Sequence, residues 1–216
     1  LEAVGASFVR DVLPGEVVTI SENGLSSRYF IPKEDAHING KLCIFEFVYF
    51  ARPDSFLDGA GVYASRQNTG KALAREAPCD CDLVVAAPDS GIAAAMGYAA
   101  EAGLPYGSAL LKNRYIGRTF IQTTQLQREM SVRLKFSVLK TEVAGKRILI
   151  VDDSIVRGTT MRNNIAILKD AGATEVHLRV ASPPVRFPCY YGVSTSNEEE
   201  LTASQFSVDE ICRKIG

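Results

Sequence analysis

Two adjacent carboxylates, followed by a short loop of small and hydroxyl-bearing residues, are the part of this sequence best suited to chemistry. Asp152 and Asp153 follow directly on the apolar run RILIV at residues 147–151. A loop then leads into a helix-like sequence and consists of Ser154, Ile155, Val156, Arg157, Gly158, Thr159 and Thr160. We expect its backbone N–H groups, the positive end of the helix and the two threonine hydroxyls to bind a phosphate. Gly158 is expected to supply the unrestricted backbone that such a loop needs.

The segments around this loop favour an α/β fold with a mainly parallel central sheet flanked by helices. From about residue 41, apolar strand-like runs alternate with helix-like stretches, which is typical of right-handed βαβ units. Because open α/β sheets bind ligands at the carboxyl ends of their strands, we expect the two acids to lie in a crevice. The predicted strands are 42–50, 82–88, 108–112, 147–151 and 175–181, and the predicted helices are 65–77, 91–103, 159–172, 198–201 and 207–216.

The first 35 residues have a different pattern. Two short β-type runs, at residues 15–20 and 26–31, flank the turn-like sequence SENGL, which predicts a β-hairpin. We therefore expect this part to be separate from the α/β region.

Composition narrows the class of protein. The 216 residues are 46% hydrophobic and 23% charged, which is typical of a globular domain and excludes disordered, collagen-like and coiled-coil classes. Lys and Arg total 24 against 25 Asp and Glu, so the chain lacks the basic excess of a nucleic-acid-binding protein. No run approaches the roughly 20 apolar residues of a membrane span. Five cysteines, an odd number in a chain of this size, favour reduced thiols and a cytoplasmic location.

A basic segment lies between the predicted strand 108–112 and residue 135. It carries six basic residues against the single acid Glu129, and these are Lys112, Arg114, Arg118, Arg128, Arg133 and Lys135. Residues 113–127 follow neither a helical nor a strand period, so we expect a long surface loop of the kind that often forms a lid. A basic face in contact with solvent is the simpler interpretation.

Two other interpretations of the acidic pair remain open from the residues alone. The pair and the loop are compatible with a charged strand end followed by a well-capped helix. They are also compatible with a response-regulator receiver domain, which gathers carboxylates at strand ends and for which Asp89 is the only candidate phosphoacceptor. The receiver interpretation does not account for the Gly-Thr-Thr sequence at 158–160.

The sequence VDDSIVRGTT resembles the loop that binds phosphoribosyl pyrophosphate (PRPP) in type I phosphoribosyltransferases. Further segments, in the same order, are similar to the glutamine PRPP amidotransferase family: FEFVYFARPDS (45–55), APDSGIAAAMGYA (87–99), LLKNRYIGRTFIQ (110–122) and SPPVRFPCYYG (182–192). The resemblance covers essentially the whole chain. It implies a type I phosphoribosyltransferase fold and an enzyme that transfers ammonia, obtained from glutamine in the intact protein, to PRPP. The products would be 5-phosphoribosylamine and pyrophosphate, in the first committed step of de novo purine biosynthesis.

The resemblance also implies roles for individual residues. Loop 154–160 would bind the 5-phosphate, while Asp152 and Asp153 would hold the ribose hydroxyls and Mg²⁺, which prefers hard oxygen ligands. Asp89, Ser90 and Gly91 would form the pyrophosphate loop, with Ser90 near the metal, although Pro-Asp-Ser-Gly is also an ordinary turn and helix cap. Lys112 and Arg114 would stabilise the leaving pyrophosphate, and Tyr115 would help to cover the site. Purine nucleotides would act as feedback inhibitors.

The same resemblance divides the chain at residue 35. Residues 1–35, which contain GASFVRDVLPGE, would be the end of a glutaminase domain, and 36–216 a phosphoribosyltransferase domain incomplete at its C-terminal end. Because the glutaminase cysteine of the family has no counterpart here, we expect no glutamine hydrolysis by this piece. Ser194 stands where the family more often has Asp. We further expect a homo-oligomer with no nucleic-acid or membrane partner.

Two cysteines match ligand positions in those family members that bind a [4Fe-4S] cluster. Cys43 and Cys189 would supply two of the four thiolates that such a cluster needs. We therefore expect a cluster in the intact protein but not in this piece; for Cys43, a small apolar strand residue is an equal alternative.

Two rival functions share the expected fold. Another type I enzyme, acting on a purine or pyrimidine base, would cleave a nucleotide with pyrophosphate. A non-catalytic PRPP-sensing regulator would need an added DNA-binding element, against which the near-neutral charge speaks.

Overall fold

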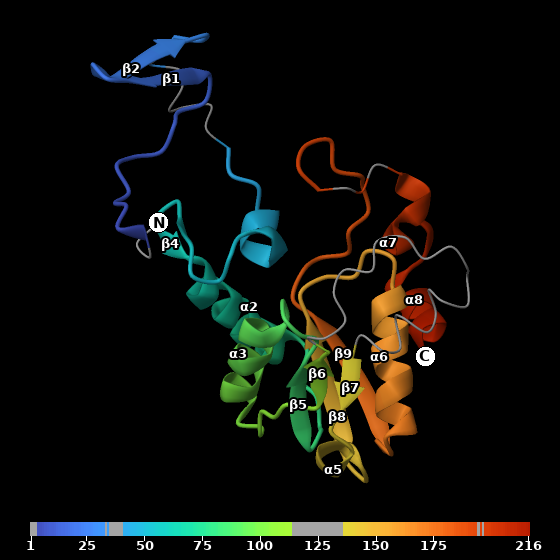
Figure 1. The fold of residues 1–216 in the computed structure, drawn as a ribbon. Coiled ribbons are helices and arrows are strands. Elements are labelled where there is room, and N and C mark those ends of the chain that lie inside the picture. Colours follow the sequence, from blue (N-terminus) through green and yellow to red (C-terminus); the bar gives the residue numbers. More distant parts are fainter. Residues whose placement is uncertain (1–3, 33, 35–40, 114–135, 194, 196) are drawn as a thin grey trace. The chain divides into compact units, whose positions relative to one another are not determined.

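The structure is a computed structural model that describes residues 4–32, 34, 41–113, 136–193, 195 and 197–216 (Figure 1). The chain divides into two units, Leu1–Cys43 and Ile44–Gly216. In the described ranges, no helix is both long enough and apolar enough to span a bilayer.

The first unit contains the predicted hairpin. Strand β1 (Glu16–Ser21) pairs antiparallel with β2 (Gly24–Tyr29), with Ser21 opposite Gly24 at the turn. The buried Glu16 carboxylate accepts two hydrogen bonds from the Arg10 guanidinium, at 2.6 and 2.8 Å, and one from the backbone N–H of Leu13 at 2.8 Å. Arg10, and after it Ser27, hold the pKa of Glu16 far below its usual value, so the buried acid is ionised and fully paired.

A three-stranded parallel sheet is the centre of the second unit. Its order is β5 (Leu83–Ala86), β8 (Arg147–Asp152) and β9 (Glu175–Val180), and β8 pairs with both neighbours. This confirms the predicted strands at 82–88, 147–151 and 175–181 and the predicted parallel pairing. Strand β8 is therefore buried on both faces, as expected for an uninterrupted apolar run.

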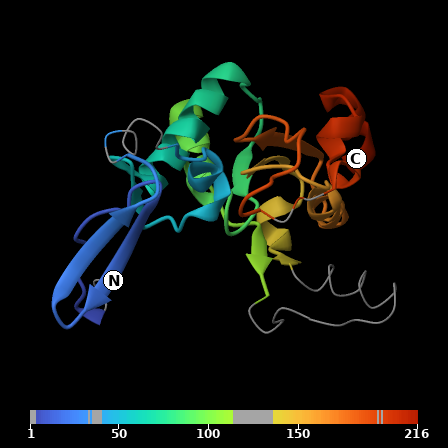
Figure 2. The same cartoon turned by 90° about the horizontal axis from the view of Figure 1, so that it is seen from above.

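Helices cover both faces of the sheet (Figures 1 and 2). Helices α2 (Val62–Glu76) and α3 (Ile92–Ala102) lie on one face, and α6 (Thr159–Asp170) and α8 (Val208–Ile215) on the other. Alternate residues of β8 enter the two cores: Leu149 packs in the cluster of α3, and Ile150 in that of α6. These helices confirm four of the five predicted ones, at 65–77, 91–103, 159–172 and 207–216.

Helices α2 and α3 approach each other through two glycines. A Cβ added at Gly70 would lie 1.9 Å from the carbonyl oxygen of Ala94, and one added at Gly97 would lie 2.0 Å from that of Gln67. Each glycine therefore sits directly against the backbone of the facing helix.

Residues 42–50 do not form the predicted strand. They include a π-helical turn, η2 (Glu46–Phe50), which the backbone N–H of Ala51 closes on the Glu46 carbonyl and which a side chain of α2 binds. The guanidinium of Arg66 in α2 donates from Nε to the Phe47 carbonyl at 2.7 Å and from Nη2 to the Ala51 carbonyl at 2.8 Å. A largely apolar run of nine residues is compatible with a buried strand or with a buried helical turn. Here the contact with Arg66 favours the helical turn.

Several short elements were absent from the prediction, since two to four residues are too few to show a period. Strand β6 (Leu110–Lys112), which confirms the prediction at 108–112, pairs antiparallel with the unpredicted β7 (Phe136–Val138). The helix predicted at 198–201 is a 3₁₀ turn, η3 (Glu198–Glu200). The remaining unpredicted elements are β3 (Phe56–Leu57), β4 (Ala60–Gly61), α5 (Lys140–Val143) and α7 (Thr202–Gln205).

An ion pair at the amino end of β8 predicts an acid-sensitive contribution to stability. Arg147 donates from Nη2 to Asp82 Oδ1 at 2.8 Å and from its backbone N–H to Oδ2 at 2.8 Å, which lowers the pKa of Asp82 from 3.8 to about 2. The ionised form is favoured by folding, so this stability is present above about pH 4 and is lost as the pH falls toward 2. Asp82→Asn should flatten the dependence of the unfolding free energy on pH in that window, measured by urea denaturation. The exposed Asp170→Asn should leave the slope unchanged, and equal slopes for all three proteins would contradict the assignment.

Candidate active site

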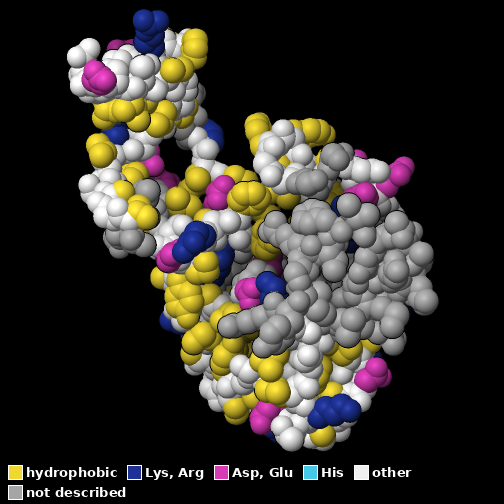
Figure 3. Space-filling view, viewed as in Figure 1, with side chains coloured by type: hydrophobic (Ala, Val, Ile, Leu, Met, Phe, Trp, Pro, Cys, Tyr) yellow, Lys and Arg dark blue, Asp and Glu magenta, His cyan; other side chains and the backbone are white. Residues whose placement is uncertain are grey.

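A cavity of about 970 Å³ opens at the carboxyl ends of β5 and β8 and at the amino end of α6. It contains most of the described residues that the sequence singles out: Asp89, Ser90, Lys112, Asp152, Asp153, Ser154, Ile155, Val156, Arg157, Gly158, Thr159 and Thr160. Gly91 adjoins it at the start of α3. Acidic and basic side chains lie side by side in a hollow of the second unit (Figure 3). The structure thus brings together segments that are more than 60 residues apart in the chain.

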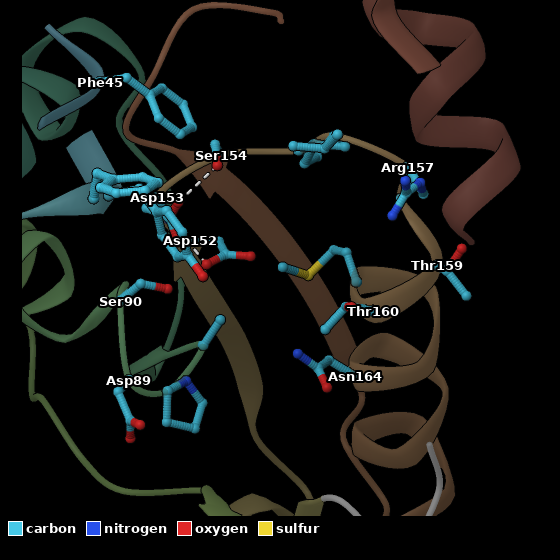
Figure 4. A pocket seen from close by; sticks show the side chains of 18 of the residues that line it. Phe45, Asp89, Ser90, Asp152, Asp153, Ser154, Arg157, Thr159, Thr160 and Asn164 are labelled. Atoms are coloured by element: carbon cyan, nitrogen blue, oxygen red, sulfur yellow. Dashed lines mark hydrogen bonds between the residues drawn. The ribbon is translucent and has the colours of Figure 1, made fainter. Parts of the chain in front are cut away.

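The acidic pair occupies the tip of β8 (Figure 4). Asp152 is the last residue of the strand, and its Oδ1 accepts the backbone N–H of Asp153 at 2.9 Å. Asp153 is only 6% exposed, and its Oδ2 accepts the Ser154 hydroxyl at 2.6 Å. Burial, and then the negative charge of Asp153, raise the pKa of Asp152 well above its usual value. A cation or a hydroxyl donor placed between these carboxylates would relieve that repulsion.

The donor set fits Mg²⁺. Two adjacent carboxylates, with the Ser90 hydroxyl pointing toward them, offer the hard oxygen ligands that this ion prefers (Figure 4). In the part of the chain that the structure describes, no group of three or more His, Cys, Asp or Glu side chains gathers as a metal site. A metal ion held by the two acids and Ser90 would have to take its remaining ligands from water or from a phosphorylated ligand, as Mg²⁺ does in other proteins.

The loop after the acidic pair presents free backbone donors. Among the described residues, no backbone N–H of 154–160 donates a hydrogen bond, and the start of α6 has no side-chain cap. Gly158 begins the helix at φ +73°, a conformation that other residues rarely adopt. Unpaired N–H groups at a helix start, together with the helix dipole, form a binding site for an anion.

Loop 154–160 is hydrogen-bonded to the segment near residue 200. The carbonyl of Val156 accepts the backbone N–H of Thr202 at 2.9 Å, and the exposed Arg157 guanidinium donates to the carboxylate of Glu200. The side chain of Arg157 is thus already paired, so its contribution to the loop lies in its backbone.

The β5–α3 loop forms the opposite wall of the cavity. Lys112, at the end of β6, donates from Nζ to Asp89 Oδ2 at 2.7 Å, and both side chains are largely exposed. A Cβ added at Gly91 would lie 2.5 Å from the carbonyl oxygen of Val151 in β8, so this loop packs directly against the strand that carries the acidic pair. Lys112, the cation expected to face the pyrophosphate, is therefore paired with Asp89 in this structure.

Some predicted residues lie outside the described part of the chain. These are Arg114, Tyr115 and Ser194, residues 114–127 of the expected lid loop, and the basic residues Arg118, Arg128, Arg133 and Lys135. The lid and the roles expected of Arg114 and Tyr115 stay predictions.

All five cysteines are free thiols. Cys43 is exposed in the first unit, whereas Cys189 is half-buried in the second, where its sulfur accepts the backbone N–H of Tyr191 at 3.4 Å. The N–H groups of Tyr191 and Val193 lower the pKa of Cys189. The expectation of an iron–sulfur cluster in a longer protein stays untested.

The sequence interpretation missed three features of the cavity wall. The first is an aromatic face made by Phe45, Tyr49 and Phe50 around η2, and the others are the buried polar residues Arg66 and Asn164. A signal was available for Arg66, because it interrupts a buried stripe of small and apolar residues spaced by four along α2: Val62, Arg66, Gly70 and Ala74. A charged residue on such a stripe indicates a tertiary partner or a ligand.

Asn164 predicts an unusual gain in stability on substitution. The residue is 0% exposed, points from α6 toward the cavity, and has no hydrogen-bond partner among the described residues for either Nδ2 or Oδ1 (Figure 4). Leaving both groups unsatisfied costs about 1–3 kcal/mol, so Asn164→Leu, which has a similar shape, should raise the unfolding free energy by roughly that amount. The neighbouring half-buried Asn163→Leu serves as control in urea denaturation. A loss of stability in Asn164→Leu alone would mean that this amide is hydrogen-bonded in solution.

Comparison with known proteins gives consistent matches. A sequence profile described as "Phosphoribosyl transferase domain" matches residues 67–194. The amidophosphoribosyltransferases of Synechococcus elongatus and Bacillus subtilis are 52% and 50% identical to this chain, and all of the chain matches 43% and 44% of their lengths. A solved structure described as glutamine PRPP amidotransferase from B. subtilis complexed with ADP and GMP superposes with a TM-score of 0.87 at 50% identity, over the whole of this chain and 46% of that one. The chain spans less than half the length of these relatives.

Proposed function

The chain belongs to the phosphoribosyl transferase domain family, and from this premise we propose that its cavity binds PRPP with Mg²⁺ and transfers the phosphoribosyl group to ammonia, with release of pyrophosphate. The observation that carries the proposal is the row of unpaired N–H groups at 154–160, directly beside the half-buried Asp152 and the buried Asp153. That combination suits a ligand with a phosphate at one end and hydroxyl groups a few ångströms away. The names of the relatives support the choice of substrate.

The reaction places opposite charges at two positions. Breaking the bond between C1 and the pyrophosphate oxygen builds positive charge on the ribose ring and negative charge on the leaving group. Asp152 and Asp153 would hold the ribose hydroxyls and stabilise the ring cation, while Lys112 and the 89–91 loop would face the pyrophosphate. A bound Mg²⁺ would neutralise part of the phosphate charge.

No side chain needs to act as a nucleophile, because ammonia can attack C1 directly. The free amides of 154–160 would fix the 5-phosphate and the acidic pair would fix the ribose. These two anchors orient C1, so that catalysis comes from positioning and electrostatics. The aromatic face of Phe45, Tyr49 and Phe50 would exclude water from the ring cation.

Two further proposals concern the longer protein and its ligands. We propose that residues 1–35 are the end of a glutaminase domain that supplies ammonia from glutamine, as the similarity of GASFVRDVLPGE suggests. We also propose that purine nucleotides compete for the 154–160 loop, because they carry a 5-phosphate on a ribose as PRPP does. The ADP and GMP in the B. subtilis structure support this.

Binding and turnover of the 216-residue chain test the proposal. Titration calorimetry with PRPP in the presence of Mg²⁺ should give saturable binding, and ammonium salts should cause release of pyrophosphate. A folded sample that binds no PRPP would contradict the site. Cleavage of a nucleotide by pyrophosphate would instead favour a base phosphoribosyltransferase, and binding without any turnover would favour a sensor.

A further inference from the structure

Arg66 is a buried cation in the wall of the large cavity. It lies in α2, is 6% exposed, and also lines a second cavity of about 430 Å³ in the same unit. Ser90 and Asp153 are the other residues that line both cavities. Arg66 therefore lies where the proposed pyrophosphate loop and the acidic pair meet.

Two of the three guanidinium nitrogens of Arg66 are occupied. Nε donates to the Phe47 carbonyl at 2.7 Å, and Nη2 donates to the carbonyls of Ala51 and Glu46 at 2.8 and 3.4 Å. For Nη1, the described part of the chain offers no acceptor, and no described carboxylate lies within ion-pair distance of the guanidinium. Three bonds thus fix the plane of the guanidinium, while the third nitrogen has no acceptor in the described ranges.

A buried charge without a partner is costly, and this one has only partial compensation. Burial lowers the pKa of Arg66, whereas the negative charge of Asp153 acts in the opposite direction. An arginine still remains charged at neutral pH, because its ordinary pKa lies far above 7. The free protein therefore holds a preoriented positive donor that an anion in the cavity would satisfy.

We propose that Arg66 is a ligand-binding residue whose Nη1 donates to an oxygen of the pyrophosphate group of PRPP, an inference that rests on the proposed function. The choice of pyrophosphate over the 5-phosphate follows from the lining residues. The second cavity, which Arg66 shares, is lined by Ser90 but by none of residues 154–160. A charged phosphate oxygen also accepts a stronger hydrogen bond from a guanidinium than a neutral hydroxyl does.

Binding of three ligands distinguishes a direct contact of Arg66 with pyrophosphate from a general disturbance of the cavity wall. Titration calorimetry of the 216-residue chain with Mg²⁺ compares PRPP, pyrophosphate and ribose 5-phosphate, the last of which lacks the pyrophosphate. Arg66→Met should weaken PRPP and pyrophosphate by roughly ten- to a hundred-fold, the range for hydrogen bonds to charged groups, and change ribose 5-phosphate less than about two-fold. Arg66→Lys, which keeps the charge and loses the fork, should fall between wild type and Arg66→Met.

The control lies on the same helix. Arg75 pairs with Glu101 on the surface at 2.8 Å, so Arg75→Met removes a charge from α2 outside the cavity and should leave all three affinities unchanged. Unchanged PRPP and pyrophosphate affinities in Arg66→Met would overturn the contact. An equal loss for all three ligands would also overturn it, because it would show that releasing the η2 carbonyls had disturbed the whole wall. A wild-type chain that binds no PRPP would reject the proposed function itself.

Discussion

Replacing both Asp152 and Asp153 by Asn is expected to weaken PRPP binding in the presence of Mg²⁺ by at least about a hundred-fold, with no loss of folding stability. Each carboxylate would make charge-assisted contacts worth about 1.5–3 kcal/mol, and about 3 kcal/mol in total already corresponds to that factor. The free protein should keep its stability, because the neutral pair removes the burial cost and the repulsion that raise the pKa of Asp152, and these gains offset the loss of the Asp153 charge near Arg66. The amide oxygen introduced by Asp152→Asn can still accept the backbone N–H that the carboxylate now binds at 2.9 Å.

Calorimetry and urea denaturation of the same samples check both halves of this expectation. The double variant Asp170→Asn and Asp209→Asn makes the same change of net charge at exposed positions, and should bind PRPP as the wild type does. If the Asp152 and Asp153 variant lost its fold together with its affinity, the acids would be structural and the binding argument would fail.

Gly70→Ala is expected to cost about 3 kcal/mol or more of unfolding free energy. The added Cβ would lie 1.9 Å from the Ala94 oxygen, 2.7 Å from its carbonyl carbon and 2.9 Å from its Cα, so backbone and not a flexible side chain would have to move. The intrinsic helix preference of alanine over glycine, about 1 kcal/mol, opposes this effect but is smaller than the cost of separating two packed helices.

Gly61, the residue before the same helix, provides the matched control. A Cβ there meets nothing within 4 Å, so Gly61→Ala should cost no more than about 1 kcal/mol, the ordinary cost of alanine at the start of a helix. Urea denaturation followed by circular dichroism measures both variants. Similar stabilities of the two would mean that α2 and α3 can separate freely, contrary to the close approach seen here.

The central elements were predictable because each one carries its pattern in consecutive residues. Strand β8 is an uninterrupted apolar run that ends in two acids, and α6 starts at a glycine and ends near another. Residues 42–50 show the limit of such patterns. Their backbone partner is Arg66, a side chain about 20 residues further along the chain, and no local period reveals it.

The candidate site likewise has a part that could be predicted from the sequence and a part that depends on tertiary packing. Residues 152–160 are contiguous, so the positions of the acids and of the loop amides could be predicted from the sequence alone. The aromatic face of η2 and the orientation of the Arg66 guanidinium depend on how α2 packs against a distant turn. The pairing of Lys112 with Asp89 is also tertiary, since it joins the end of β6 to the loop after β5.

That last pair has a consequence for selectivity. In the free protein, the ammonium group of Lys112 is already paired with Asp89, so an arriving anion meets a cation whose charge is partly neutralised. An exposed pair of this kind contributes about 0–1 kcal/mol, which a multiply charged oxyanion can exceed and which chloride or acetate would struggle to match. The resting ion pair would thus weaken the binding of a small monovalent anion at Lys112 by at most about five-fold.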